Sequence, residues 1–287
     1  MNSGPGKRPT VAAVAIAKNE ERDLPGFLRH LQTWVDEIVI VDDGSTDRTL
    51  EIIRAAGGKV KLIERRMSAD GFSGQRNAGI KAATCDWLLH MDIDERVTPE
   101  LAEEMCAGLD NAELNGYRYR RLNFFLHRPM RAGGWQRWNN PQLARRGRHR
   151  FENVIHERCV IDGGNERTGQ LRGFMWHLND EDYVERVGKN LRYMKLSGEG
   201  ILERGTRVRW YHLLFDPAYR AFKSYVVYHG YRAGVRGLIL ALYTFSGTFN
   251  WWAYAWDRQN RVARATLEDD LRRSWDAKPV RRGEADG

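Results

Sequence analysis

The chain has 287 residues, 42% hydrophobic and 29% charged, enough for one large α/β domain with an appendage or for two small domains. Glycine (28) and proline (8) make up about one residue in eight, which argues against a mainly disordered or fibrous protein. Three cysteines without a CxxC spacing argue against a disulfide framework or a cysteine-built zinc site. Lys18 and Glu20 interrupt the first apolar run too early for a signal peptide, so we expect a cytoplasmic location.

The first 110 residues alternate short apolar runs with amphipathic stretches. The runs predict strands at 11–17, 38–41, 59–63 and 87–91. Between them, helices are predicted at 24–35, 46–56 and 77–83, and Thr98-Pro99-Glu100 predicts the start of a fourth. This order predicts an α/β fold whose mostly parallel sheet has helices on both faces. Ligands of such sheets bind beyond the carboxyl ends of the strands.

The composition changes after Tyr117. Residues 118–150 hold ten arginines interleaved with aromatic residues and contain no lysine, aspartate or glutamate. Residues 180–204 have a helical pattern, 204–236 carry seven Lys/Arg against one acid, and 237–256 contain no charge. We therefore divide the chain into residues 1–115, residues 116–180, and a basic, aromatic-rich helical extension at 181–287.

Asp92 and Asp94 directly follow the fourth predicted strand. Residues i and i+2 of an extended segment point to the same side, so both carboxylates can face one divalent cation. Two carboxylates that leave several positions free suit Mg²⁺ or Mn²⁺ bridged to a diphosphate. The alternative interpretation is a solvated acidic loop. The position of Asp92 and Asp94 at the end of an apolar strand favours the metal site over this alternative.

Polar segments also follow the earlier strands. A carboxylate of Asp42-Asp43-Gly44-Ser45 can accept from a pyrimidine N–H or a ribose hydroxyl, although an Asx turn that caps the next helix explains part of this segment. Lys18-Asn19-Glu20 ends the first strand and, alone, is an ordinary polar loop. Gln75-Arg76-Asn77 places a cation before a helix, where Arg76 and backbone N–H groups can meet phosphate.

In order, the segments KNEE, VDDGSTD, GQRNAGI and MDIDE resemble the nucleotide-sugar-binding half of family 2 glycosyltransferases, which have the GT-A fold. Later segments are similar to the subgroup of lipopolysaccharide-core β-1,4-glucosyltransferases: Gly133-Gly134-Trp135, 145–147, 155–158, His177 and 236–242. The resemblance covers about residues 10–258. Members of that subgroup often carry histidine before the Gly-Gly-Trp, where this chain has Ala132, and this departure concerns the acceptor.

The resemblance implies transfer of a sugar, with inversion, from an NDP-sugar (a UDP-sugar) to a hydroxyl of a cell-envelope glycan or lipid-linked acceptor. Residues 1–115 would then be the nucleotide-sugar half and 116–180 the acceptor half. The implied metal ligands are Asp92, Asp94 and His177, and the implied acceptor residues are Gly133, Gly134, Trp135, Arg145 and His156. The implied donor residues are Ala17, Lys18, Asn19, Glu20, Asp42, Asp43, Gly44, Ser45, Gln75, Arg76, Asn77 and Asp92.

Chemical roles follow from the charges that develop during transfer. The bound metal and Arg76 would stabilise the leaving diphosphate, while a carboxylate on the opposite face takes the proton of the attacking hydroxyl. Glu157 is the candidate base because the resemblance places its segment at the acceptor cleft, and Asp94 and Glu95 are rivals. A salt bridge with Arg158 or Arg150 is the structural alternative for Glu157.

Two further residues have open interpretations. His177 is either a metal ligand or a packed, hydrogen-bonded histidine. Trp135 stacks on a sugar ring or shapes the cleft, or else it belongs to the core.

The uncharged stretch 237–256 is long enough to span a bilayer, but Thr244 and Asn250 make it a mediocre span. Its aromatic residues near the end, Trp251, Trp252, Tyr254 and Trp256, resemble an interfacial aromatic belt. With the upstream cations, this pattern favours peripheral attachment to the anionic inner face of the cytoplasmic membrane. The alternative is a helix that packs on the catalytic domain or on a second subunit.

Two other classes of function compete with the transferase. A sugar nucleotidyltransferase needs a glycine-rich N-terminal loop with a cationic signature, which residues 11–25 lack. A non-catalytic basic module for acidic lipid or nucleic acid would need no metal. No helix-turn-helix, zinc-finger or RNP-like motif accompanies the arginines, so we expect no specific nucleic-acid partner.

Overall fold

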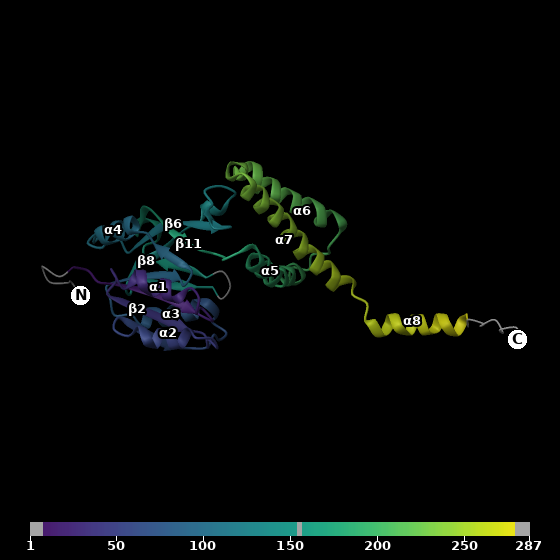
Figure 1. Ribbon diagram of the computed structural model, residues 1–287, viewed down its shortest axis with the longest axis horizontal. Coiled ribbons are helices and arrows are strands. Elements are labelled where there is room, and N and C mark those ends of the chain that lie inside the picture. Colours follow the sequence, from purple (N-terminus) through teal and green to yellow (C-terminus); the bar gives the residue numbers. More distant parts are fainter. Residues whose placement is uncertain (1–7, 154–156, 279–287) are drawn as a thin grey trace.

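The computed structural model describes residues 8–153 and 157–278 (Figure 1). Within these residues, nine strands form one mixed sheet in the order β3-β2-β1-β4-β8-β6-β11-β5, with β7 paired to β6, and β9 and β10 form a separate hairpin. The strands are β1 (Val11–Ala17), β2 (Glu37–Asp42), β3 (Val60–Glu64), β4 (Trp87–Asp92), β5 (Glu95–Val97), β6 (Gly116–Phe125), β7 (Arg128–Pro129), β8 (Asn139–Arg145), β9 (His149–Glu152), β10 (Arg158–Ile161) and β11 (Thr168–His177).

Helices flank this sheet and form the C-terminal part of the chain. The α-helices are α1 (Leu24–Leu31), α2 (Thr49–Ala56), α3 (Gly71–Ala82), α4 (Pro99–Gly108), α5 (Tyr183–Glu203), α6 (Trp210–Phe222), α7 (Val235–Asn260) and α8 (Arg264–Ala277). Short 3-10 helices are η1 (Trp135–Arg137), η2 (Gly164–Arg167) and η4 (Gly230–Ala233), and a π-helix, η3 (Lys223–Val227), continues α6.

The four strands predicted from apolar runs are present, and β1 to β4 are parallel to one another as predicted. β8 then pairs antiparallel with both β4 and β6, so the sheet is mixed beyond β4. Thr98 caps α4, its side chain accepting a hydrogen bond from the Leu101 amide. α2 begins at Thr49, later than predicted, because the Asp47 side chain accepts from the Thr49 amide and holds 46–48 as a turn.

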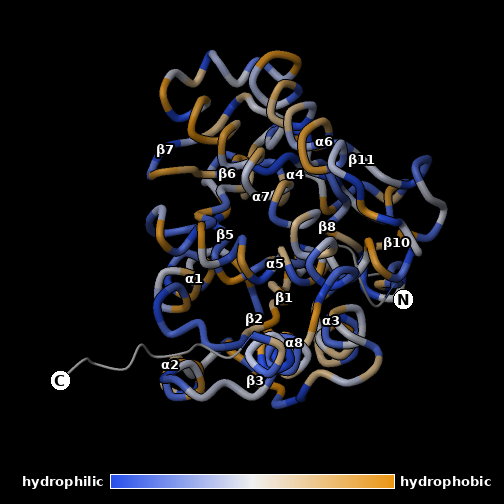
Figure 2. The backbone as a smooth tube through the Cα atoms, turned by 90° about the vertical axis from the view of Figure 1, so that its right-hand side faces the viewer, coloured by the Kyte–Doolittle hydropathy of each residue, from blue (hydrophilic) through white to orange (hydrophobic). Residues whose placement is uncertain are grey.

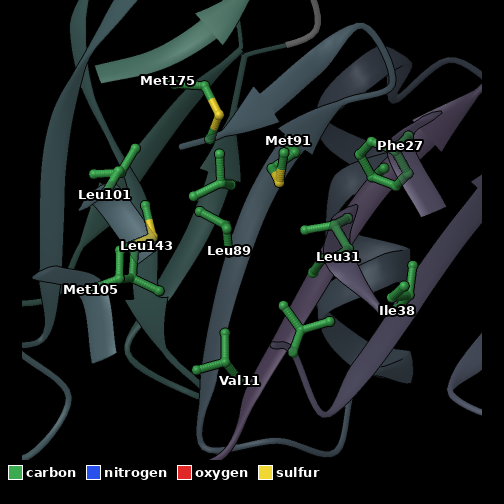
Figure 3. Close-up of a cluster of buried hydrophobic side chains, with 14 of the residues drawn as sticks. Val11, Phe27, Leu31, Ile38, Leu89, Met91, Leu101, Met105, Leu143 and Met175 are labelled. Carbon is green, nitrogen blue, oxygen red and sulfur yellow. The ribbon is translucent and has the colours of Figure 1, made fainter. Parts of the chain in front are cut away.

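Helices cover both faces of the parallel part of the sheet. On one face, Phe27 and Leu31 of α1 and Leu101 of α4 pack on β1, β2 and β4 (Figure 3). Full burial of each such side chain contributes about 1.5–3 kcal/mol. On the other face α3 lies so close to β1 that a Cβ at Gly79 would stand 2.4 Å from Val14 Cγ1. The predicted fold class, a GT-A-like α/β sheet with helices on both faces, is confirmed.

β11 leads into α5, and α7 packs against both α5 and α6 beside the sheet (Figure 1). α8 stands away from this bundle and is exposed along its whole length. Trp252, predicted to lie in an interfacial belt, stacks on His212 of α6 with ring centroids 4.6 Å apart, and its Nε1 donates to Asp216 (2.9 Å). None of the helices in the described part of the chain combines the length and apolarity that crossing a bilayer requires.

Candidate active site

The ends of β1, β2 and β4 meet at one edge of the sheet. In the parallel register Ala17 lies beside Asp42, and Ile16 lies beside Asp92. The loops that follow these strands therefore share one edge, as the sequence predicts for a ligand site. Five of the predicted donor and metal positions lie at these strand ends: Ala17, Lys18, Asp42, Asp43 and Asp92.

The carboxylate of Asp42 is used inside its own turn. It is buried and accepts hydrogen bonds from the backbone amides of Gly44 (2.8 Å) and Ser45 (2.9 Å) and from the Ser45 hydroxyl. Gly44 has φ of +76°, a conformation that glycine adopts without strain. Ser45 Oγ in turn accepts from the Asn19 amide (2.8 Å), which ties the β1 and β2 loops together. The Asx-turn interpretation thus accounts for Asp42.

The pKa values of Asp43 and Glu20, two carboxyl groups at this edge, are shifted in opposite directions. Burial acts against the charge of Asp43, but hydrogen bonds from Lys18 Nζ (2.7 Å) and the Met67 amide (2.5 Å) hold its pKa below the ordinary value. Burial, followed by the negative charge of Asp94, raises the pKa of Glu20 to about 7. The loop edge therefore presents an ionised Asp43–Lys18 pair beside a carboxyl group that titrates near neutrality.

Asp92 lies between two arginines. Its Oδ1 is 2.8 Å from Arg76 Nη2, and its Oδ2 is 3.2 Å from Arg121 Nη2. Although desolvation disfavours its charged form, the two guanidinium groups hold the pKa of Asp92 well below its ordinary value. The site thus contains a permanently ionised carboxylate and two cations within hydrogen-bond distance of it.

Glu95 lies beneath this cluster. It is 1% exposed, its Oε2 accepts from the Asp92 amide (2.9 Å), and its Oε1 is 2.6 Å from Arg121. Burial raises the pKa of Glu95 to about 7. A side chain so enclosed supports the Asp92 backbone and Arg121, and it has no surface to offer an acceptor hydroxyl.

Glu157 reaches the same cluster from the far half of the chain. Its Oε1 is 3.4 Å from Nε of Arg76, so one buried guanidinium contacts both Asp92 and Glu157. Arg76 is held in place by the ring of Phe151, 5.3 Å from its Cζ. A salt bridge with Arg150 was one alternative role for Glu157 from the sequence, but Arg150 pairs with Glu152 and Asp162 instead.

Asp94 and His177 form the second contact pair of the site. His177 Nε2 is 3.1 Å from Asp94 Oδ2, and His177 Nδ1 is 2.7 Å from Asn123 Oδ1. The Asn123 amide nitrogen donates to the Trp135 carbonyl (2.8 Å), so its oxygen faces His177 and accepts from Nδ1. In the neutral imidazole the lone pair therefore lies on Nε2, toward Asp94.

These residues provide the donor types that a divalent cation uses. Asp94 and His177 are in contact and offer oxygen and nitrogen, while Asp92 is held by arginines. Within residues 8–153 and 157–278 no three His, Cys, Asp or Glu side chains are already clustered as a metal site. Two protein ligands fit Mg²⁺ or Mn²⁺ if the diphosphate and water supply the other positions.

Two predicted donor residues have structural roles. Gln75 is buried, its amide donating to the Arg65 carbonyl (2.6 Å) and accepting from the Arg65 guanidinium (2.8 Å). Asn77 exchanges two hydrogen bonds of 2.9 Å with the backbone of Phe151. Both amides are therefore engaged in fixing neighbouring segments, and only Arg76 of this motif reaches the acidic cluster.

Arg145, predicted to bind the acceptor, lies far from the acidic cluster. β8 runs antiparallel to β4, so Arg145 pairs with Trp87 at the start of β4, whereas Asp92 is at its end. The Arg145 guanidinium donates to the carbonyls of Leu114 and Asn111, both at 2.9 Å. This register does not bring Arg145 together with the acidic cluster. His156 lies outside the described residues.

The Gly133-Gly134-Trp135 segment joins the site to the C-terminal helices. The Gly133 amide donates to the Tyr228 carbonyl (2.8 Å), and Ser224 Oγ donates to the Gly133 carbonyl (3.0 Å). Both glycines have positive φ, and a Cβ at Gly134 would stand 2.6 Å from the Tyr228 ring. The Trp135 ring packs against Phe125 and beneath the Arg186 guanidinium, 4.7 Å from its centroid.

Sequence reasoning missed Arg121 and Asn123. Both project from β6 two residues apart, so they lie on the same side of the strand and reach Asp92 and His177. The run of arginines at 118–150 without nearby acids could have indicated that some of them pair with acids from other elements. Arg121 does so, because its partners Asp92 and Glu95 come from β4 and β5.

A sheet of this order with an acidic cluster at its carboxyl edge is the architecture expected of a GT-A glycosyltransferase. The model of the glycosyl transferase family 2 matches residues 13–164, and the chain belongs to this family, as its motifs predicted. It is 30% identical over 271 residues to the lipopolysaccharide core biosynthesis glycosyltransferase LpsC of Rhizobium meliloti (strain 1021), covering 91% of this chain and 97% of that protein. It is 32% identical over 241 residues to an uncharacterized glycosyltransferase of Rickettsia felis, covering 80% and 83%.

Among solved structures, the chain is similar to S. aureus TarS 1-349 in complex with UDP-GlcNAc, with a TM-score of 0.47 and 15% identity over 89% of this chain and 93% of that chain. It is also similar to glucosyl-3-phosphoglycerate synthase from Mycobacterium tuberculosis in complex with Mn²⁺, UDP and glucosyl-3-phosphoglycerate. That likeness has a TM-score of 0.42 and 16% identity, over 63% of this chain and 75% of that chain.

Proposed function

We propose that this family 2 glycosyltransferase transfers a hexose, with inversion, from a UDP-sugar to a hydroxyl of a cell-envelope glycan or lipid-linked acceptor, and that the reaction depends on Mg²⁺ or Mn²⁺. The observation that carries the proposal is the double contact of Arg76 with Asp92 and Glu157. It brings a cation suited to a diphosphate and a carboxylate suited to proton transfer into one cluster.

The donor side of the site is the edge formed by the first two loops. Asp43 with Lys18, and Asn19 with Ser45, offer the acceptor and donor groups that a pyrimidine ring and a ribose require. Arg76 and Arg121 supply fixed positive charge where the diphosphate leaves. Asp94 and His177 would hold the divalent cation, which when bound acts as a Lewis acid toward the diphosphate, while Asp92 stays paired with the two arginines.

In the transfer step, the acceptor oxygen forms a bond to the anomeric carbon while the bond from that carbon to the diphosphate oxygen breaks. The electron pair of the broken bond leaves with the diphosphate, and the hydroxyl proton passes to the Glu157 carboxylate. Attack opposite the leaving group inverts the anomeric centre. Glu157 is preferred over its two rivals because Glu95 is buried and Asp94 is assigned to the divalent cation with His177.

The acceptor class rests on the relative of known role. That relative is named as a lipopolysaccharide core biosynthesis enzyme, and it matches nearly the whole chain. We therefore place the nucleotide-sugar half at residues 1–115, the acceptor half at 116–180, and a membrane-associated helical part at 181–287. The proposed location is the cytoplasm, peripheral to the inner face of the cytoplasmic membrane.

The test is release of NDP from a panel of NDP-sugars with Mg²⁺ or Mn²⁺, followed by NMR of the glycoside formed on a lipopolysaccharide-core acceptor. UDP release and an inverted anomeric signal are expected. Glu157→Gln keeps the size of the side chain but removes its basicity, so transfer should fall by about 10²–10⁴-fold while UDP binding stays near normal. Glu152→Gln, an exposed residue of the same segment, is the control. Transfer by Glu157→Gln within a few-fold of wild type would assign the base elsewhere.

A further inference from the structure

The outward face of α6 and η3 is apolar and has no partner within the described chain. Trp210 (67% exposed), Phe215 (65%) and Tyr219 (58%) project from α6, together with Leu214, Phe222, Val226 and Val227. Phe215, Tyr219, Phe222 and Val226 recur every three or four residues, which places them on one side of the helix, while Trp210 stands at its first residue. The other side is buried through Pro217 and Ser224, where α6 packs on α7 and the Gly133 loop. Figure 2 shows several hydrophobic turns in α6.

The sequence stretch that contains this face is strongly basic. Residues 204–236 contain the single acid Asp216, which is paired with Arg220 (2.9 Å) and with Trp252 Nε1 (2.9 Å). Seven cations lie in the same stretch: Arg204, Arg207, Arg209, Arg220, Lys223, Arg232 and Arg236. Arg207 and Arg209 lie beside Trp210 at the start of α6, and Lys223 Nζ is 5.6 Å from the centroid of the Tyr219 ring. An exposed apolar face with cations beside it is the pattern of a helix that lies on an anionic bilayer.

At the start of α6 the cations and aromatic rings form a concavity of about 750 Å³. It is lined by Arg207, Arg209, Trp210, Tyr211 and Trp256, among others. Guanidinium groups bind phosphate through paired N–H donors, and tryptophan and tyrosine rings favour the level of the lipid headgroups. This concavity therefore has the chemistry of an anionic lipid headgroup site at one end of the apolar face.

We propose that the outward face of α6 and η3, with the cations around it, docks the protein on an anionic lipid bilayer. The surface overlaps only in part with the one that the sequence favoured: Trp252 of 237–256 packs on His212 and donates to Asp216 of α6, whereas Trp256 lines the concavity. A second copy of the chain is the poorer occupant, since it would bring the same cations against each other. The inference rests on the peripheral location proposed above but not on the transfer chemistry.

The docking face is connected to the active site by a short series of contacts. Ser224 and Tyr228 hold Gly133 on the inner side of the helical bundle, and the Trp135 carbonyl two residues later accepts from Asn123. Asn123 orients His177 at the acidic cluster. A bilayer under α6 would therefore lie at a fixed position relative to the catalytic groups, which suits an acceptor embedded in the membrane.

The test is flotation of the full chain with vesicles of 70% phosphatidylcholine and 30% phosphatidylglycerol, compared with phosphatidylcholine alone, across a NaCl series. Wild type should float with the anionic vesicles, and the bound fraction should fall as salt screens the cations. Phe215→Ser with Phe222→Ser should lower the partition coefficient by about 10- to 100-fold, because two rings are no longer buried in lipid. Arg207→Glu should lower binding at low salt more than at high salt.

The matched control is Leu271→Ser with Trp275→Ser, which removes two comparably exposed apolar side chains from α8. This variant should float like wild type. Equal flotation of the α6 variant and wild type would overturn the proposal. A second outcome would also overturn it: light scattering shows that the wild type is a dimer, this dimer does not float with vesicles, and the α6 variant is a monomer. The face would then bind a second copy of the chain. Flotation needs neither donor nor acceptor, so its outcome is independent of the proposed transfer, which UDP release measures.

Discussion

Arg76 Nη2 lies 2.8 Å from Asp92 Oδ1, across the gap between α3 and the end of β4. The same buried guanidinium also contacts Glu157, so one side chain joins the two halves of the acidic cluster. Because both contacts use the planar fork of arginine, an ammonium cannot replace it without loss of one partner.

Arg76→Lys should therefore lower turnover while the protein remains folded. Loss of one preorganised charged donor at a leaving group costs about 10²–10³-fold in kcat. The measurement is UDP release under saturating donor, with thermal unfolding as the check on folding. Arg150→Lys, an exposed position paired with Glu152, is the control and should keep full activity. Turnover of Arg76→Lys equal to the control would place the diphosphate elsewhere.

Metal dependence can be tested on binding alone. If Asp94 and His177 hold a cation that bridges to the diphosphate, UDP affinity measured by calorimetry should require Mg²⁺ or Mn²⁺. Asp94→Asn should weaken that metal-dependent affinity and abolish turnover without unfolding the protein. Equal affinity for UDP with and without a chelator would contradict the proposed metal bridge.

The pKa of Glu20 predicts a stability change with pH. Burial raises this pKa from 4.5 to about 7, so the folded state holds the proton over a range in which the unfolded state has released it. The stabilisation is complete below about pH 4.5 and is lost as the pH rises through 7. Glu20→Gln removes this titration, so its advantage in unfolding free energy over wild type should grow between pH 5 and pH 8.

Urea denaturation at the two pH values measures the effect, and Glu21→Gln, in the next position of the same loop, serves as control. If the difference in unfolding free energy between Glu20→Gln and wild type is the same at pH 5 and pH 8, the surroundings of Glu20 do not raise its pKa.

The parallel half of the fold was predictable because apolar runs and strand-end polar residues are local patterns. Asp92, Arg76 and Glu157 were found as candidates from sequence, but their common contact was not, since Glu157 arrives from a segment beyond β9. The position of Arg145 relative to this cluster was not predictable for a related reason: the direction of β8 in the sheet is set by tertiary pairing, and no local pattern distinguishes its two ends. The family assignment is unaffected because it depends on motifs in the parallel half.

The contacts of the aromatic end of α7 were likewise not predictable from a local sequence pattern. A tryptophan pair after an apolar run has one sequence pattern whether it faces lipid or another helix, and here the Trp252 ring is covered by His212. Trp252→Phe keeps the stacked ring and loses the Nε1 hydrogen bond to Asp216, which should cost about 1.5–3 kcal/mol of unfolding free energy for a bond to a charged group. Trp252→Ser should cost more, because the ring is lost as well. Urea denaturation measures both, and Trp256→Phe, at a ring that is 47% exposed, should be nearly neutral. The folded Trp252→Phe variant should still float with anionic vesicles like wild type; unchanged stability combined with lost flotation would instead make Trp252 a lipid contact.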